Sequence, residues 1–292
     1  MNMNANVTSG TNTIKAPKIL ITGATGKTGK RIAHKLEQQG GSVRHGSRNG
    51  NPAFDWNDDS TWAPALRNIE SVYLSYFPDL AVPQAPAAIQ KFCAMAKTEG
   101  VEHLVLLSGR GEPAAQACEE IVQASGLAWT IVRASWFNQN FSEGAFAEMV
   151  ASGVIALPVD NVLEPFIDVD DIADVAVAAL RATRHRYQLY EVTGPRLLSF
   201  SEIAKELSLA LGKEIRFVPI STKVFLQEMR RKGVPAETLE LLVFLFKEVL
   251  DGRNAYTSKG VEEALGRPAR DFSTYANTLT QTETHKQEEI SA

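Results

Sequence analysis

The chain has 292 residues, with 30 Lys and Arg against 34 Asp and Glu, and 44% of its residues are hydrophobic. The formal net charge is therefore −4. This composition is that of an ordinary globular protein, and it excludes disordered, fibrous and disulfide-scaffold classes. Because the chain has no basic block, it offers no electrostatic footprint for a nucleic acid or an anionic membrane, and we expect neither as a partner.

The two cysteines, Cys93 and Cys118, lack CxxC spacing. They predict reduced, structural thiols in a cytoplasmic protein. Residues 1–15 are rich in Asn and Thr and lack the regions of a signal peptide, so we interpret them as a disordered tail, and residues 281–292 as a flexible tail. No apolar run approaches the ~20 residues that a membrane span needs.

From residue 18 onward, short apolar runs alternate with helical stretches. This alternation predicts an α/β fold: a Rossmann, doubly wound parallel sheet within an NADP-binding domain at residues 16–153. The expected strands are Ile19–Ile21, Ser42–Ser47, Ser71–Tyr76, His103–Leu107 and Trp129–Val132, and the expected helices are Arg31–Gln38, Ala87–Lys97 and Ala114–Ala124.

After Arg133 the alternation of apolar runs and helical stretches becomes less regular. We expect a strand at Phe166–Asp168, a helix at Asp170–Arg181, a strand at Gln188–Val192 and mostly helix from Ser199 onward. Residues 154–280 would thus complete the sheet and form a smaller, mainly helical C-terminal substrate lobe. The apolar stretch 240–249 indicates lobe core, a pocket wall or a subunit interface, and the last of these would make the protein a homodimer.

A glycine-rich loop with GxxGxxG spacing follows the first strand and opens a helix. In a dinucleotide site Gly23 permits the tight turn, Gly26 lets the backbone approach the pyrophosphate, and Gly29 allows close packing of helix on sheet. The loop also resembles the end of a Walker A motif, but Ile21 stands where that motif needs glycine. The predicted phosphate-binding residues are Gly23, Thr25, Gly26, Lys27, Thr28 and Gly29.

The end of the second strand carries no acidic residue for a ribose 2′-hydroxyl. Instead, Ser47 and Arg48 can bind a 2′-phosphate, with Arg44 adding charge if its side chain points the same way. This pattern favours NADPH over NADH, although exposed arginines are also common on surfaces. Asp55 either binds the adenine amino group or caps a helix.

Several motifs together resemble the NmrA-like family of atypical short-chain dehydrogenases/reductases. The resemblance rests on the glycine loop, on Ser47-Arg48, and on four further segments: Leu107–Gly109, Ser125–Arg133, Trp136–Phe141 and Phe166–Ala173. It covers about Ile19 to Phe272. The segments Gly194–Ile203 and Leu265–Pro268 are similar to the subgroup that contains the ergot-alkaloid enzymes festuclavine synthase and agroclavine dehydrogenase and many bacterial relatives.

This resemblance implies an NADP(H)-binding Rossmann domain and a small lobe over a cleft. Family members reduce quinones, iminium alkaloids or dyes, whereas the regulator that gives the family its name senses dinucleotides without turnover. By position, Tyr76, Phe77, Ser108 and Gly109 would lie beside the nicotinamide. The family segment that lines the substrate side corresponds to Trp136, Phe137 and Asn140.

Most short-chain reductases protonate the nascent alkoxide with a Tyr-xxx-Lys pair, and this chain has none. Tyr256 comes nearest, but Lys259 follows one position too close, and the region after Ser108 offers Glu112 and Gln116 instead. An ordinary alcohol dehydrogenase is therefore disfavoured. Tyr76 is our first candidate for a catalytic hydrogen-bond donor and Ser108 the second, each with a purely structural alternative.

The leading hypothesis is thus an NADPH-dependent oxidoreductase acting on a small apolar or aromatic substrate, such as a quinone, an iminium or a secondary-metabolite intermediate. The alternatives are a non-catalytic NADP(H)-sensing regulator and a nucleotide-sugar epimerase-like enzyme. We interpret the carboxylates Asp168, Asp170 and Asp171 as structural, with Asp170 as a helix N-cap. The five histidines lack metal-binding spacing, so we expect no metal.

Overall fold

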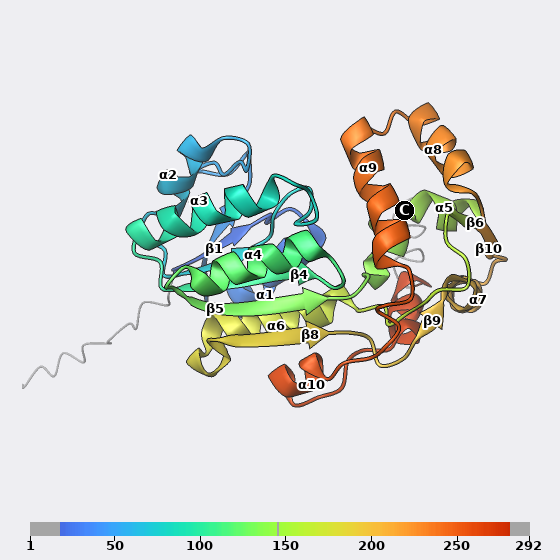
Figure 1. Ribbon diagram of the computed structural model, residues 1–292. Helices are drawn as coiled ribbons and strands as arrows, with labels where there is room; N and C mark the ends of the chain where they lie inside the picture. Colours follow the sequence, from blue (N-terminus) through green and yellow to red (C-terminus); the bar gives the residue numbers. More distant parts are fainter. Residues whose placement is uncertain (1–17, 145, 281–292) are drawn as a thin grey trace, which may run out of the picture.

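The computed structural model describes residues 18–144 and 146–280, so the two predicted tails lie outside the described residues. Six strands form one parallel sheet in the order β2-β1-β3-β4-β5-β8, with helices on both faces (Figure 1). The predicted doubly wound Rossmann fold is confirmed. The strands are β1 (Lys18–Thr22), β2 (Ser42–Gly46), β3 (Ser71–Leu74), β4 (His103–Gly109), β5 (Ala128–Ala134) and β8 (Gln188–Val192). The flanking helices are α1 (Lys27–Gln38), α2 (Trp62–Leu66), α3 (Ala85–Thr98), α4 (Pro113–Ala124), α6 (Val169–Arg181) and α10 (Gly260–Leu265).

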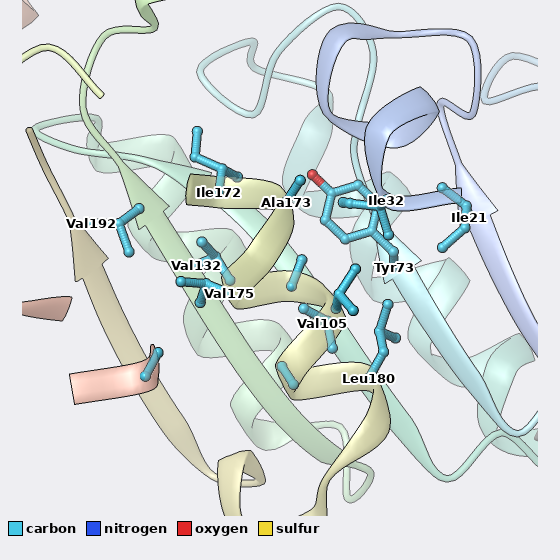
Figure 2. Packing of buried hydrophobic residues seen from close by; sticks show 14 of the residues in the cluster. Ile21, Ile32, Tyr73, Val105, Val132, Ile172, Ala173, Val175, Leu180 and Val192 are labelled. Atoms are coloured by element: carbon cyan, nitrogen blue, oxygen red, sulfur yellow. The ribbon is translucent and has the colours of Figure 1, made fainter. Parts of the chain in front are cut away.

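Two hydrophobic clusters hold the helices to the sheet, one on each face. Helices α1 and α6 cover one face, where Ile172, Val175 and Leu180 pack over the strands near Val105 and Val132 (Figure 2). Helices α2, α3 and α4 cover the other face. Because the central strands are buried on both sides, they are continuous apolar runs without alternation, which is typical of parallel sheets.

The order of the strands creates a switch point. The chain passes from β1 to β2 on one side and then returns to place β3 on the other side of β1. Ligands of doubly wound sheets bind at such a point, outside the carboxyl ends of the strands. In this protein those ends are at Thr22, Leu74 and Gly109.

The C-terminal lobe has a core of its own, rich in phenylalanine, in which Phe141, Phe166 and Phe200 are buried. Within it β6 pairs with β10 in parallel, and β7 pairs with β9 in antiparallel orientation. Its elements are α5 (Ala147–Ser152), β6 (Val154–Leu157), β7 (Leu163–Glu164), β9 (Leu198–Ser199), α7 (Phe200–Leu211), β10 (Arg216–Pro219), α8 (Thr222–Arg231), α9 (Ala236–Phe244) and a π-helical turn (Leu245–Val249).

Three expectations for the second half were wrong. Phe166–Asp168 is not a strand: only Ile167 bridges, to Phe137, because Asp168 already begins the next helix. The N-cap of α6 is Asp168 and not Asp170, since the Asp168 carboxylate accepts the Asp170 amide at 2.8 Å. The strand β10 was missed within a segment expected to be mostly helical.

Candidate functional site

A cavity of about 640 Å³ opens at the carboxyl edge of the sheet and continues to the C-terminal lobe. This volume lies in the range of small-molecule sites. The cavity gathers every residue predicted for the site except Gly29. Those that line it are Gly23, Thr25, Gly26, Lys27, Thr28, Ser47, Arg48, Asp55, Tyr76, Phe77, Ser108, Gly109, Trp136, Phe137 and Asn140.

The glycine loop turns tightly between β1 and α1. Gly23 has a φ of 62°, in the region that favours glycine, and its carbonyl accepts the Gly26 amide at 2.9 Å. A β-carbon on Gly29 would overlap the carbonyl oxygen of Gly23, so Gly29 packs under the loop rather than lining the cavity. At Gly26 a β-carbon would approach only the Gly23 oxygen, at 3.2 Å.

The N-terminus of α1 faces the cavity without a cap. Gly26 occupies the N-cap position, no side chain caps the helix, and its first turn has no acidic residue. Lys27 adds a half-buried ammonium, whose pKa is lowered by burial against the opposing effect of Glu143. Amide groups, helix dipole and ammonium together fit the charge and the donor needs of a pyrophosphate.

Arg48, just after β2, carries a positive charge that no described residue neutralises. The Arg48 side chain is exposed and makes no ion pair or side-chain hydrogen bond with any residue in the described ranges. Arg44 is engaged elsewhere: its Nη1 donates to the carbonyls of Ala65 at 2.7 Å and Arg67 at 2.9 Å. Arg48 is therefore the arginine of this strand end that lies at the cavity.

Asp55 also lies at the cavity and does not cap a helix. Its carboxylate accepts the Asn57 amide at 3.0 Å, while Asp58 caps the following short 3-10 turn at Asp59–Thr61. Of the two roles that the sequence left open for Asp55, the capping role is wrong.

The two candidate hydrogen-bond donors differ in their surroundings. The Tyr76 ring packs 4.8 Å from the Trp56 ring, and burial raises the pKa of its hydroxyl. The buried Ser108 Oγ donates to Glu119 Oε1 at 2.6 Å, and Glu119 is also ion-paired with Arg133. The Ser108 proton is thus held by a carboxylate, and a raised pKa makes Tyr76 a weaker acid than free tyrosine.

The lobe supplies an aromatic and aliphatic wall. Trp136 stacks on Phe146 and Phe246, with ring centroids 6.3 and 5.7 Å apart. Leu242 and Leu245 line the cavity as well. The apolar stretch 240–249 therefore serves both as lobe core, through the buried Phe246, and as pocket wall.

Asn140 lies in a short 3-10 helix (Asn138–Phe141), and Glu143 holds the loop that follows this helix against α1. Glu143 pairs with Lys30 at 2.6 Å and with Arg31 at 2.5 Å. Burial alone would raise the pKa of Glu143, but the hydrogen bonds and charges of Arg31 and Lys30 lower it to about 2. This ion-pair cluster fixes the loop between the glycine-loop helix and the lobe.

Sequence reasoning missed three carboxyl groups that line the cavity, namely Asp79, Glu112 and Glu164. Glu164 is 1% exposed, and its nearest cation, Arg110, is 3.9 Å away. Burial raises the pKa of Glu164 to about 7, and Arg110, which also binds Glu191 and the carbonyls of Asn254 and Tyr256, offsets this effect only in part. The sequence drew attention to Glu112 only as a residue in the region where a Tyr-xxx-Lys pair was sought, and nothing in the sequence indicated Glu164.

Residues 18–144 and 146–280 contain no helix long and apolar enough to cross a membrane. They also contain no group of three His, Cys, Asp or Glu side chains placed to hold a metal ion.

Two family profiles match this chain. Residues 23–183 match the profile of an NAD(P)H-binding family, and residues 116–279 match that of the NmrA-like family. The chain belongs to the NmrA-like family. The resemblance inferred from the motifs is thereby confirmed, and with it a nicotinamide dinucleotide as the kind of cofactor that the family binds.

Several named proteins align with most of this chain. The NAD(P)H azoreductase of Xenophilus azovorans is 30% identical over 88% of this chain and 96% of its own. Agroclavine dehydrogenase of Claviceps fusiformis is 27% identical over 89% and 96%. An NADPH-dependent quinone oxidoreductase of Escherichia coli, solved with NADPH, shares the fold at a TM-score of 0.71 and 21% identity, over 89% of this chain and 99% of that one.

Proposed function

We propose that this protein is an NADPH-dependent reductase that transfers a hydride to a small, flat, apolar or aromatic acceptor, such as a quinone, an iminium or a secondary-metabolite intermediate. The observation that carries the proposal is the continuity of one cavity, from the glycine loop along the strand ends to the wall of Trp136, Leu242 and Leu245. The azoreductase, dehydrogenase and quinone oxidoreductase named above support a redox role.

The residues at the cavity divide into two groups. The amides at the start of α1, with Lys27, would hold the pyrophosphate; Ser47 and Arg48 would hold the 2′-phosphate, and Asp55 the adenine amino group. Tyr76, Phe77 and Gly109 would lie beside the nicotinamide ring. When bound, the dinucleotide supplies a hydride. The lobe wall would orient a flat acceptor and exclude water, and Asn140 would add a polar contact.

The test has two parts. Calorimetric titration with NADPH and NADH should show tighter binding of NADPH, and NADPH oxidation should be measured across quinones, iminium salts, azo compounds and ketones. Turnover of any acceptor supports the reductase. Tight binding without turnover across the panel would favour the dinucleotide-sensing regulator, and conversion of a nucleotide sugar without net oxidation of NADPH would favour the epimerase-like enzyme. Absence of cofactor binding would overturn all three.

A further inference from the structure

Two carboxyl groups meet at the cavity where the short-chain Tyr-xxx-Lys pair is missing. Asp79 follows β3 and Glu112 follows β4, so both lie at the carboxyl edge of the sheet. Each of the two carboxyl groups shifts the pKa of the other. Carboxyl groups that interact in this way do not readily ionise together.

The Glu112 side chain is buried and is not used by the fold. It is 7% exposed, and its Oε2 has no hydrogen-bond partner among the described residues. Glu112 occupies the N-cap position of α4, yet its side chain makes no capping bond. A β-carbon on Gly109 would overlap the Glu112 carboxyl group, so this group lies directly against the backbone beside Ser108. An unpartnered buried polar atom of this kind needs an explanation.

Burial and the surrounding charges favour the protonated form of Glu112. Burial, Asp79 and Glu119 all raise the pKa of Glu112 well above its ordinary range. Neither Glu112 nor Asp79 has a cation within ion-pair distance in the described part of the chain, whereas Glu119 is paired with Arg133. Burial raises the pKa of Asp79 as well, but its carboxylate accepts the Ala81 amide at 2.8 Å, which favours its ionised form.

We propose that Glu112, which lines the cavity together with Asp79, is the general acid that protonates the acceptor. This inference rests on the proposed reductase function. A quinone or azo acceptor takes up a hydride and one proton; the O–H bond of Glu112 breaks, and an O–H or N–H bond forms on the acceptor. Two adjacent carboxylates then remain, and their repulsion is relieved when one proton enters from solvent through Asp79. The net reaction consumes one proton and one NADPH for each acceptor.

An iminium acceptor provides the sharpest control, because hydride addition to it needs no proton. In Glu112→Gln, kcat for a quinone or azo acceptor should fall about 10²-fold, within the usual range for a positioned acid, while kcat for an iminium changes less than about threefold. Glu120→Gln, on the exposed side of the same helix, should change neither. Asp79→Asn should shift the alkaline limb of the quinone pH profile to lower pH, because Asp79 raises the pKa of Glu112.

A second measurement does not depend on turnover. At neutral pH and without ligands, the infrared difference spectrum of wild type minus Glu112→Gln should show a carboxylic-acid C=O band, because the contribution of Glu164 cancels in it. The difference spectrum of wild type minus Glu120→Gln should show no such band. Absence of the band from the first difference spectrum, or full quinone activity in Glu112→Gln, would overturn this inference alone. If Glu112→Gln does not fold, an unshifted pH profile in Asp79→Asn overturns it. Absence of all turnover in the wild type, with the band present, would instead overturn the proposed function.

Discussion

Replacing Glu164 by glutamine should remove about 2.5 kcal/mol of pH dependence from the stability of the ligand-free protein between about pH 5 and pH 8.5. Glu164 is 1% exposed and lies 3.9 Å from Arg110, which is engaged mainly by other partners. Its pKa rises from 4.5 to about 7 on folding because of burial. Folding therefore strengthens proton binding at this carboxyl group.

The sign and the size follow from linkage. Because the pKa is raised in the folded state, the stabilising contribution is fully present below pH 4.5 and is lost as the pH rises through about 7. A shift of about 2.5 units corresponds to roughly 3.4 kcal/mol in total, and about 2.5 kcal/mol of this lies between about pH 5 and pH 8.5. Glutamine does not titrate, so the variant should lack this component.

The assay is urea denaturation of wild type and Glu164→Gln over a pH series, with the free energy of unfolding taken by linear extrapolation. The difference between the two proteins is the measured quantity, since the other titrating groups cancel in it. Glu262→Gln, at an exposed position of α10, serves as the control and should follow the wild type. Parallel stability curves for wild type and Glu164→Gln would refute the reasoning that burial outweighs Arg110.

Three further predictions concern the cavity. Arg48→Ala should weaken NADPH binding about tenfold or more and leave NADH binding nearly unchanged, because one charged contact is worth ~1.5 to 3 kcal/mol. Binding is measured by calorimetry, with Arg216→Ala at an exposed position as the control. An equal loss of affinity for both cofactors in Arg48→Ala, or the same loss of NADPH affinity in Arg216→Ala, would contradict the prediction. Gly26→Val should fold, as judged by circular dichroism, but should lose dinucleotide binding, since the added side chain takes the space that the pyrophosphate needs. A folded variant with wild-type affinity would show that the glycine-rich loop does not bind the pyrophosphate. Tyr76→Phe should keep kcat for a quinone or an iminium within about tenfold, and a loss of 10²-fold or more for the quinone alone would identify Tyr76 as a general acid.

Local pattern was enough to predict the first half of the fold. The alternation of apolar runs and helices, and the GxxGxxG loop between β1 and α1, follow from neighbouring residues and from short-range geometry. The second half was harder because its elements depend on distant partners. β10 exists by pairing with β6, some sixty residues earlier, and Ile167 forms a single bridge because Phe137 lies beside it.

The site divides in the same way. By itself, the sequence determined the family, the glycine loop, the residues Ser47 and Arg48 after β2, and the absence of a Tyr-xxx-Lys pair, since each is a contiguous pattern of residue types. Only the tertiary structure decided that Arg44 turns away from the cavity and that the Ser108 hydroxyl donates a hydrogen bond to Glu119. It alone brought Glu112 to Asp79 and buried Glu164 near Arg110. The pKa of a carboxyl group depends on its burial and on nearby charges. Both are set only when the strands and the lobe pack together and bring residues that are distant in sequence close in space.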